Sequence, residues 1–361
     1  MRVFLIIAAI VVLAAGAAAG YLWYSMQKPF GHIPPPGVFV EIPRGASQRT
    51  AARILAKDGV IRSALAFELY ARRHPKRPVQ AGEYFFDHPL AGKEVFWKLA
   101  KGEVYEQLFT VREGDTIFDI ANNLESANYM KAREFLNAAT DAAQIQDIAP
   151  GAKTLEGFLF PATYNLPHHF TAADLTNVMV RKFRDALEQI APDRLEPLTP
   201  GTPLLSVVTL ASLVEAETSK PEERPMVAGV YTNRLHKQML LQCDPTVIYA
   251  LKQGDKYNPP LLLKDLRYDS PYNTYIHAGL PPGPIGNPGE GSLKAALNPS
   301  STEFLYFVSN TQGGHFFAST LAEHNKNVAK YHRLLNGEPA DPPVTEVHQT
   351  HSGSRAHKGK R

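Results

Sequence analysis

The N-terminal segment has the clearest pattern of hydrophobic and polar positions in the chain. No charged residue lies between Arg2 and Lys28, and the intervening run is almost wholly apolar. As a helix, about 25 uncharged residues reach roughly 37 Å, which exceeds the roughly 30 Å hydrocarbon core of a bilayer. The pattern therefore predicts a transmembrane anchor over residues 1–26 that contacts the membrane through residues 3–26.

The flanks of this run predict its orientation. Arg2 and the amino terminus favour a cytoplasmic N-terminus, and Tyr21, Trp23 and Tyr24 suit the far interface as an aromatic belt. A signal peptide is the alternative, because Ala17-Ala18-Ala19 resembles a cleavage site, although a signal sequence has an apolar core of only about 7–15 residues. Both interpretations place the rest of the chain outside the cytoplasm.

Short strands and amphipathic helices follow the apolar run. The segment 27–37 is rich in proline and predicts a stiff stalk. Strands are predicted at 38–43 and 81–86, and the mixture of both periodicities predicts an α+β fold. Helices are predicted at 47–59 with Ser47 as N-cap, 61–75, 93–102 closed by Gly102, 171–190, 204–218 and 224–239.

One strand–turn–helix pattern occurs twice. The segments IPRGASQRTAARIL and VREGDTIFDIANNL align when the first is shifted by 69 positions. Shared capping chemistry or chance could also produce so short a match. The pattern predicts a helix capped by Asp115 or Thr116 in the second copy. The aligned pairs are Gly45 with Gly114, Ser47 with Thr116, Ala52 with Ala121, and Leu55 with Leu124.

The second copy lies in a segment that is similar to a known glycan-binding module. FTVREGDTIFDIA, residues 109–121, resembles the opening of a LysM module, a small fold that binds glycans containing N-acetylglucosamine. The resemblance implies a LysM-like glycan-binding α/β region, which we place at 38–150. An ordinary strand-to-helix connection is the alternative, since Gly-Asp-Thr is favourable turn chemistry.

An apolar helix predicted at 204–218 ends in two carboxylates, Glu215 and Glu217. Burial of a carboxylate is costly unless it is paired or protonated, and a protonated glutamic acid can donate a proton to a leaving group. At about 100° per residue the two side chains point some 200° apart, with Glu217 nearer the polar edge. Glu215 is then a structural or helper group paired with Arg224 or Arg234. A core helix whose end turns to solvent is the alternative.

Candidate sugar-binding groups follow this helix. The segment 279–291 is dense in proline and glycine, which makes it rigid and lets backbone N–H groups approach a ligand. Aromatic faces with a few fixed polar groups are typical of carbohydrate sites. Asp244 is also the candidate for a second carboxylate, although Asp-Pro-Thr equally suits a turn or a helix cap. The predicted substrate-binding residues are Gln242, Asp244, Tyr272, Asn273, Thr274 and Tyr275.

Long motifs in this half of the chain resemble one enzyme family. ASLVEAET, VYTNRL, LQCDPTVIYAL, YNTYIHAGLPPGPIGNPG, SLKAALNP, FLYFVSN and GGHFFASTLAEHN, in this order, resemble the endolytic murein transglycosylases, the MltG or YceG-like family. The match extends from about residue 3 to residue 335. It implies one membrane span, a LysM-like region and a catalytic domain at 151–335, with the catalytic glutamate at the second acid of ASLVEAET, Glu217. His315 and His324 could serve the site or be structural.

The resemblance also implies an activity and a location. Family members cleave the β-1,4 bond between N-acetylmuramic acid and N-acetylglucosamine within nascent peptidoglycan strands, leave 1,6-anhydro-muramic ends, and so terminate glycan polymerisation. The expected location is the bacterial plasma (inner) membrane, with the catalytic domain on the periplasmic or extracytoplasmic side. Peptidoglycan synthases are expected nearby, although no residue identifies that contact. A non-enzymatic wall-binding scaffold and a two-carboxylate muramidase are the alternatives.

Composition narrows the remaining function classes. The net charge of +3 points to no nucleic-acid partner, and the single cysteine, Cys243, allows no intramolecular disulfide. Neither glycine-rich phosphate motif nor a zinc-type spacing occurs, so no cofactor and no metal are predicted. The polar segment 336–361 lacks the apolar residues for a core and is predicted to be a disordered tail.

Overall fold

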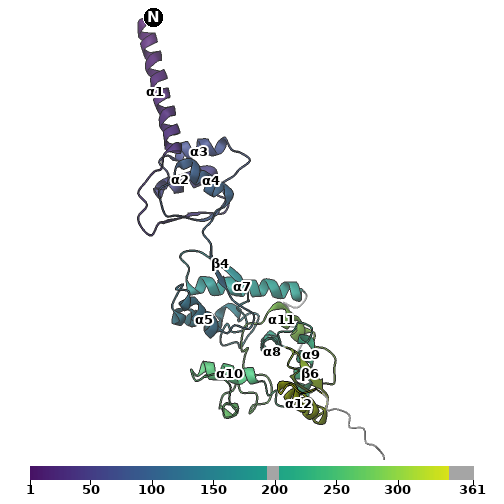
Figure 1. Cartoon of the computed structure of the whole chain (residues 1–361). Helices are drawn as coiled ribbons and strands as arrows, with labels where there is room; N and C mark the ends of the chain where they lie inside the picture. The colour runs from purple at the N-terminus through teal and green to yellow at the C-terminus, as the bar shows by residue number, and fades with distance from the viewer. Residues whose placement is uncertain (193–202, 341–361) are drawn as a thin grey trace, which may run out of the picture. The chain divides into compact units, whose positions relative to one another are not determined.

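The computed structural model describes residues 1–192 and 203–340, so most of the predicted 336–361 tail lies outside the described residues. The chain is a mixture of helices and short antiparallel two-stranded sheets (Figure 1). It divides into two compact units: unit 1 comprises 1–110 and 163–171, and unit 2 comprises 111–162 and 172–361. The boundary predicted at residue 150, between a glycan-binding region and a catalytic domain, stays a prediction.

Unit 1 begins with the apolar helix α1, Arg2–Gln27, which is long and apolar enough to cross a membrane, with a mean hydropathy of 2.7. Its last turn enters the core of the unit, since Met26 is buried against α4. The segment after it also packs on the unit: the Phe30 N–H donates to the Leu90 carbonyl at 3.3 Å, and Ile33 is buried. The remaining elements are β1 (Val38–Ile42), α2 (Gln48–Lys57), α3 (Ala64–Arg72), β2 (Gly82–Phe86), α4 (Gly92–Lys101), β3 (Gln107–Thr110) and β4 (Thr163–Leu166).

The predicted repeat is confirmed and extends further than the sequence indicated. Gly45 and Gly114 both have positive φ, and Ser47 and Thr116 both cap a following helix. In each copy a strand, two helices and a second strand follow in order, with the two strands antiparallel: β1 with β2, and β3 with β4. The aligned apolar positions are buried in both copies: Ala52, Leu55, Ala121 and Leu124.

Unit 2 consists mainly of helices around α8 (Leu204–Glu217), with one hairpin formed by β5 (Tyr306–Ser309) and β6 (His315–Ala318). Helix α8 is buried along most of its length and packs against its neighbours α9, α10 and α11. This explains its almost uniformly apolar sequence, because a helix surrounded by other helices needs no polar face. The other elements are α5 (Ile117–Ser126), α6 (Ala132–Ala139), η1 (Ala142–Ile145), α7 (Ala172–Ile190), α9 (Arg224–His236), α10 (Asp244–Gln253), η2 (Asp265–Arg267), α11 (Glu290–Leu297) and α12 (Leu321–Leu335).

Candidate active site

Glu217 is the last residue of α8 and lies where the buried helix reaches a cleft. The residues from Val207 to Val214 are buried, whereas Glu217 is half-buried. The helix ends at Thr218, whose extended backbone turns the chain away. The Glu217 carboxyl group therefore lies between the apolar core and solvent. A catalytic acid needs such a position, because it must be shielded from water and still be accessible to a substrate.

Two side chains bond the Glu217 carboxyl from its protein side. The Tyr231 hydroxyl, from α9, donates to Oε1 at 2.5 Å, and Tyr231 itself is 1% exposed. The thiol of the buried Cys243, just before α10, bonds the same carboxyl group. Because both partners are rigidly enclosed, the carboxyl has one defined orientation.

Burial raises the pKa of Glu217, and the nearby charge of Asp244 adds to that effect. The hydrogen bonds from Tyr231 and Cys243 and the neighbouring His315 act in the opposite direction, because they favour the ionised form. The net shift is upward. The protonated state of Glu217 thus persists to higher pH than that of an exposed glutamate, as a proton donor requires.

The carboxyl opens onto a cleft of about 230 Å³ in unit 2. Helices α8, α9 and α10 each contribute residues to it, and the β5–β6 hairpin supplies an apolar and polar rim. Charged, amide, hydroxyl and aromatic groups all reach this space, a mixture that suits a sugar. The lining residues are Glu217, Arg234, Leu241, Gln242, Asp244, Tyr275, Phe307, Val308, Ser309 and His315.

A second carboxylate lies on the same cleft. Asp244 is the first residue of α10, and its Oδ1 accepts a 2.5 Å hydrogen bond from the Tyr275 hydroxyl. Gln242, two residues earlier, has a left-handed backbone with φ of 49°. The structure thus brings three of the six predicted substrate-binding residues, Gln242, Asp244 and Tyr275, to the cleft that Glu217 lines.

The other three predicted residues contact protein groups of their own loop or of the α10 region. The Asn273 amide donates to the carbonyls of Leu266 and Tyr268, and the Thr274 hydroxyl accepts from the Cys243 N–H. Both side chains are fully buried. Tyr272 packs on another tyrosine ring and borders a separate small cavity with prolines 282 and 284. These residues shape the loop, and their contact with substrate stays a prediction.

His315 lines the cleft and is bonded from behind. Its Nδ1 lies 2.7 Å from Glu223 Oε2, and its backbone N–H donates to Oε1 of the same carboxylate. Although burial opposes it, these hydrogen bonds lower the pKa of Glu223, so the carboxylate is ionised and only accepts. Nδ1 therefore carries a hydrogen and donates it to Glu223, which fixes the orientation of the ring.

Arg234 supplies a cation to the cleft and ties its walls together. Its guanidinium donates to the carbonyls of Leu305 at 2.6 Å and Leu241 at 2.8 Å. Burial lowers the pKa of Arg234. The interactions link α9 to the segment before α10 and to the residue that precedes β5, so this side chain positions two cleft-lining segments at once.

Sequence patterns did not indicate a role for Tyr231, which bonds Glu217 from behind the cleft, or for Phe307 and Ser309, which line it. Tyr231 lies three residues before Arg234 on one helix, a spacing that puts both on one face. That spacing was the available signal. No sequence signal pointed to Phe307 and Ser309, because only the register of the β5–β6 hairpin brings β5 to the cleft.

Glu215 is structural, and of its two predicted partners Arg224 is the one it contacts. The Arg224 guanidinium donates to Glu215 at 2.9 Å and to Glu113 at 3.2 Å. The Glu215 side chain is 7% exposed, and it also accepts the Gly289 N–H. A buried carboxylate thus holds the proline- and glycine-rich loop against α8, because an unpaired charge there would be costly.

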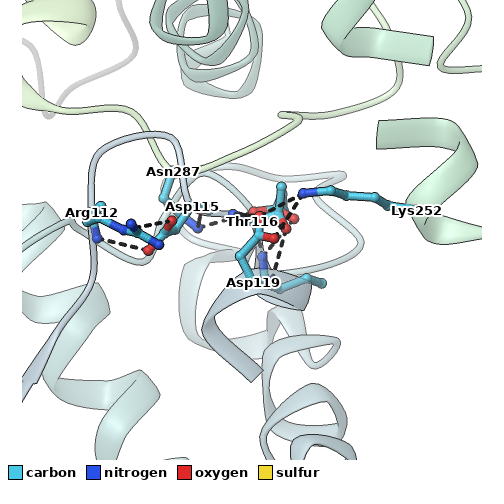
Figure 2. Close-up of polar contacts among 8 residues, drawn as sticks. Arg112, Asp115, Thr116, Asp119, Lys252 and Asn287 are labelled. Carbon is cyan, nitrogen blue, oxygen red and sulfur yellow. Dashed lines mark hydrogen bonds and ion pairs between the residues drawn. The ribbon is translucent and has the colours of Figure 1, made fainter. Parts of the chain in front are cut away.

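The same loop is fixed from its other side by the turn at 112–115. Asn287, fully buried, accepts from the Leu159 N–H and donates to the Asp115 carbonyl at 2.8 Å. Figure 2 shows Asn287 next to Asp115, with the Thr116, Asp119 and Lys252 cluster beside it. The turn that resembles a LysM opening is therefore bonded to the loop that follows the candidate site.

A buried carboxyl group, that of Glu156, also contacts Asn287. Glu156 is 1% exposed and accepts hydrogen bonds from the Ile117 N–H at the start of α5, from Asn287 and from Tyr249. Burial raises the pKa of Glu156 to about 8, which the hydrogen bonds only partly oppose. Three segments of unit 2 thus meet at one group that is neutral at moderate pH.

Among residues 1–192 and 203–340, no group of three or more histidine, cysteine, aspartate or glutamate side chains could hold a metal ion.

An enclosed carboxyl, a second carboxylate and aromatic side chains on one cleft define the class of enzymes that cleave glycosidic bonds. Comparison with known proteins gives the family. The family model described as "YceG-like family" matches residues 40–330, and the chain belongs to this family.

Relatives agree with this assignment. The chain is 35% identical over 309 residues to the endolytic murein transglycosylase of Bacillus subtilis (strain 168), covering 81% of this chain and 84% of that protein. It is 29% identical over 362 residues to the endolytic murein transglycosylase of Streptococcus pneumoniae serotype 2, of which it spans 65%. A crystal structure of a protein described as YceG-like, from Listeria monocytogenes, has a TM-score of 0.55 at 33% identity, covering 80% of this chain and 98% of that one.

The buried Glu156 carboxyl, which joins three segments of unit 2, should make the stability of that unit depend on pH. Its folded-state pKa of about 8 exceeds the ordinary value of 4.5, so its stabilising contribution is fully present below about pH 4.5 and is lost as pH rises through about 8. Glu156→Gln should flatten the fall in melting temperature of unit 2 between these limits, as measured by calorimetry. Glu134→Gln, on the surface of α6, is the control and should leave the slope unchanged. An unaltered slope in Glu156→Gln would contradict the assignment.

The loop–turn contact predicts a steric effect of one methyl group. A Cβ at Gly286 would lie 2.7 Å from the Gly114 carbonyl oxygen, whereas one at Gly283 would meet only the Tyr272 hydroxyl at 3.4 Å. Gly286→Ala should destabilise unit 2 by about 1–3 kcal/mol, as overpacking does. Gly283→Ala should cost less. Denaturant unfolding compares the two, and equal effects would show that the close approach is unimportant.

Proposed function

We propose that this chain is a membrane-anchored endolytic murein transglycosylase that cleaves the β-1,4 bond between N-acetylmuramic acid and N-acetylglucosamine within nascent peptidoglycan strands. The observation that carries the proposal is the Glu217 carboxyl, with its raised pKa, at the head of the cleft. Family membership and the names of the relatives support the same reaction.

In this mechanism Glu217 acts twice. Its protonated carboxyl donates to the glycosidic oxygen as the bond to C1 breaks, and the resulting carboxylate then takes the proton of the muramic C6 hydroxyl. That hydroxyl oxygen attacks C1 of the same sugar and closes the 1,6-anhydro ring. Because the nucleophile is part of the substrate, its attack requires little loss of entropy, and no water has to be positioned.

The other cleft residues have supporting roles. Tyr231 and Cys243 orient the carboxyl, while the negative charge of Asp244 stabilises the positive charge that develops at C1. Gln242 and Tyr275 bind the sugar by an amide and an aromatic face, and Nε2 of His315 forms a hydrogen bond with a sugar hydroxyl. Asp244 also supports the alternative of a two-carboxylate hydrolase, in which it would activate water.

The remaining parts of the chain bear on where in the cell this reaction takes place. We propose that α1 spans the plasma membrane with its N-terminus in the cytoplasm, so that both units lie outside, and that the LysM-like region, 38–150, binds glycan. Cleavage in nascent strands would end their polymerisation. The helix α1, which has no charged residue after Arg2 and carries aromatic residues near its end, supports the anchor.

Removal of the ionisable group from Glu217 tests the central assignment. Glu217→Gln keeps the size of the side chain and should reduce the digestion of purified sacculi by about 10²–10⁴-fold, which is the contribution of general acid–base catalysis. Glu222→Gln, five residues on at the surface, is the matched control and should remain active.

Mass analysis of the fragments distinguishes the functions. Anhydro-muramic ends are expected from the native chain, whereas reducing ends would assign it to the hydrolases. Undiminished digestion by Glu217→Gln would exclude this site. No digestion by either form would favour the wall-binding scaffold.

Tyr231 gives a second, independent prediction. Its hydroxyl favours the ionised form of Glu217, so Tyr231→Phe raises the pKa of Glu217 further. Because the proton donor is active below that pKa, the alkaline limb of the activity–pH profile should move to higher pH. Tyr70→Phe in unit 1 is the control. If the variant's activity fell at every pH while the alkaline limb stayed at the same pH, Tyr231 would have only a packing role.

A further inference from the structure

Helix α3 presents an unusual outer face for a unit that is otherwise well packed. Leu65 is 56% and Leu69 40% exposed, one helical turn apart. Within unit 1, outside α1, Leu108 is the one other large hydrophobic side chain so exposed. Phe67 on the opposite face is fully buried, so the helix needs neither leucine for its attachment to the core. An exposed apolar strip of this kind needs a partner.

Basic residues continue the same face. Arg73 follows Leu65 and Leu69 at a four-residue spacing, and Lys76 and Arg77 come in the turn after the helix. All three are exposed and have no acidic partner within the described residues, whereas Arg72 pairs with Glu68 at 2.6 Å. A helix face that is apolar and then basic is the pattern of a segment lying in a membrane interface.

The position of α3 brings this face to the end of the membrane span. Helix α3 packs against α1, and in Figure 1 it lies where α1 enters unit 1. The guanidinium of Arg62, just before α3, lies 5.1 Å from the Tyr24 ring of α1 and 4.6 Å from the Phe30 ring. Its Nε is buried without a hydrogen-bond partner. The aromatic end of the span is thus continuous with the α3 face.

Positive charge is concentrated in the N-terminal part of the chain, which lies next to α1. Residues 28–110 contain 13 Lys and Arg against 8 Asp and Glu, a net charge of +5, whereas residues 111–361 contain 24 against 27, a net charge of −3. The excess of cations therefore lies in the unit attached to the membrane helix, where the attraction of an anionic surface acts over about one Debye length.

We propose that α3 and the turn after it, residues 62–77, form a membrane-surface contact that binds the phosphate headgroups of anionic phospholipids. Leu65 and Leu69 enter the interface, and Arg73, Lys76 and Arg77 contact the headgroups. Together with α1 this gives unit 1 two attachments to the membrane, so it is fixed in tilt and rotation as well as tethered. The inference rests on the proposed span by α1 and is independent of the chemistry at Glu217.

The test measures the depth of α3 in a bilayer. The full-length chain with Leu69→Cys is spin-labelled and reconstituted in nanodiscs that contain phosphatidylglycerol or phosphatidylcholine alone. Native Cys243 is buried, so the label reports residue 69. Accessibility to oxygen and to an aqueous nickel chelate distinguishes lipid from water. We expect residue 69 to be exposed to lipid with phosphatidylglycerol and to shift towards water without it.

Charge reversals provide the matched controls. Arg73→Glu, Lys76→Glu and Arg77→Glu together should return the label to water in anionic nanodiscs. The same charge change on α2, Arg49→Glu, Arg53→Glu and Lys57→Glu, should leave it in lipid, because those exposed residues lie on a different helix. The proposed membrane contact would be refuted if the two charge reversals had equal effects. It would also be refuted if the label at residue 69 stayed in water with phosphatidylglycerol.

A label at Gly16→Cys, within α1, separates this result from failure of the anchor. Lipid exposure at residue 16 with water exposure at residue 69 would refute the α3 contact alone. Water exposure at both positions would refute the membrane span and the contact together. Neither outcome depends on whether Glu217→Gln is inactive.

Discussion

The arrangement of unit 2 depends on the cost of enclosing one carboxyl group. Glu217 ends a helix whose preceding residues are buried, so its side chain cannot be fully hydrated. The protein compensates with the Tyr231 hydroxyl and the Cys243 thiol rather than with a cation. Neutral donors stabilise the group without lowering its pKa as far as a salt bridge would. The result is a shielded acid whose pKa lies above that of an exposed glutamate.

Glu215, two residues earlier, shows the opposite solution. Its carboxylate faces a guanidinium and a backbone N–H, and it fixes the loop at 289 to α8. Asn287 and Glu156 continue this fixation on the side of the 112–115 turn. The two acids of one motif therefore have different roles: Glu215 is bonded to Arg224 and supports the loop, whereas Glu217 lines the cleft with a raised pKa.

Unit 1 follows a different constraint, the attachment of a soluble core to an apolar helix. Met26 is buried in that core, so α1 is joined rigidly to the unit. The excess positive charge of residues 28–110 and the exposed leucines of α3 lie in the same unit. A membrane surface satisfies both features at once, because it offers apolar chains below and phosphate groups above.

Local chemistry made much of the fold readable from the sequence. The apolar helix α1, the cap at Ser47 and the helix stop at Gly102 were predicted, since each depends on residues within a few positions. For the second cap the sequence left Asp115 and Thr116 open, and the structure has Thr116. The second strand of each repeat was not recognised as a partner of the first, because pairing across some 40 to 60 residues leaves no local signal.

The candidate site shows the same division. Sequence motifs singled out Glu217, Gln242, Asp244 and Tyr275, which the fold brings to one cleft, and Arg224 as one of two candidate partners of Glu215. Sequence could not separate Tyr275 from Tyr272, since neighbouring residues of one type carry equal signals until a fold points them in different directions. Residue type and short spacing thus determined which chemistry the chain carries. Only tertiary structure decided which groups share one cleft, because that depends on contacts between segments far apart in the chain.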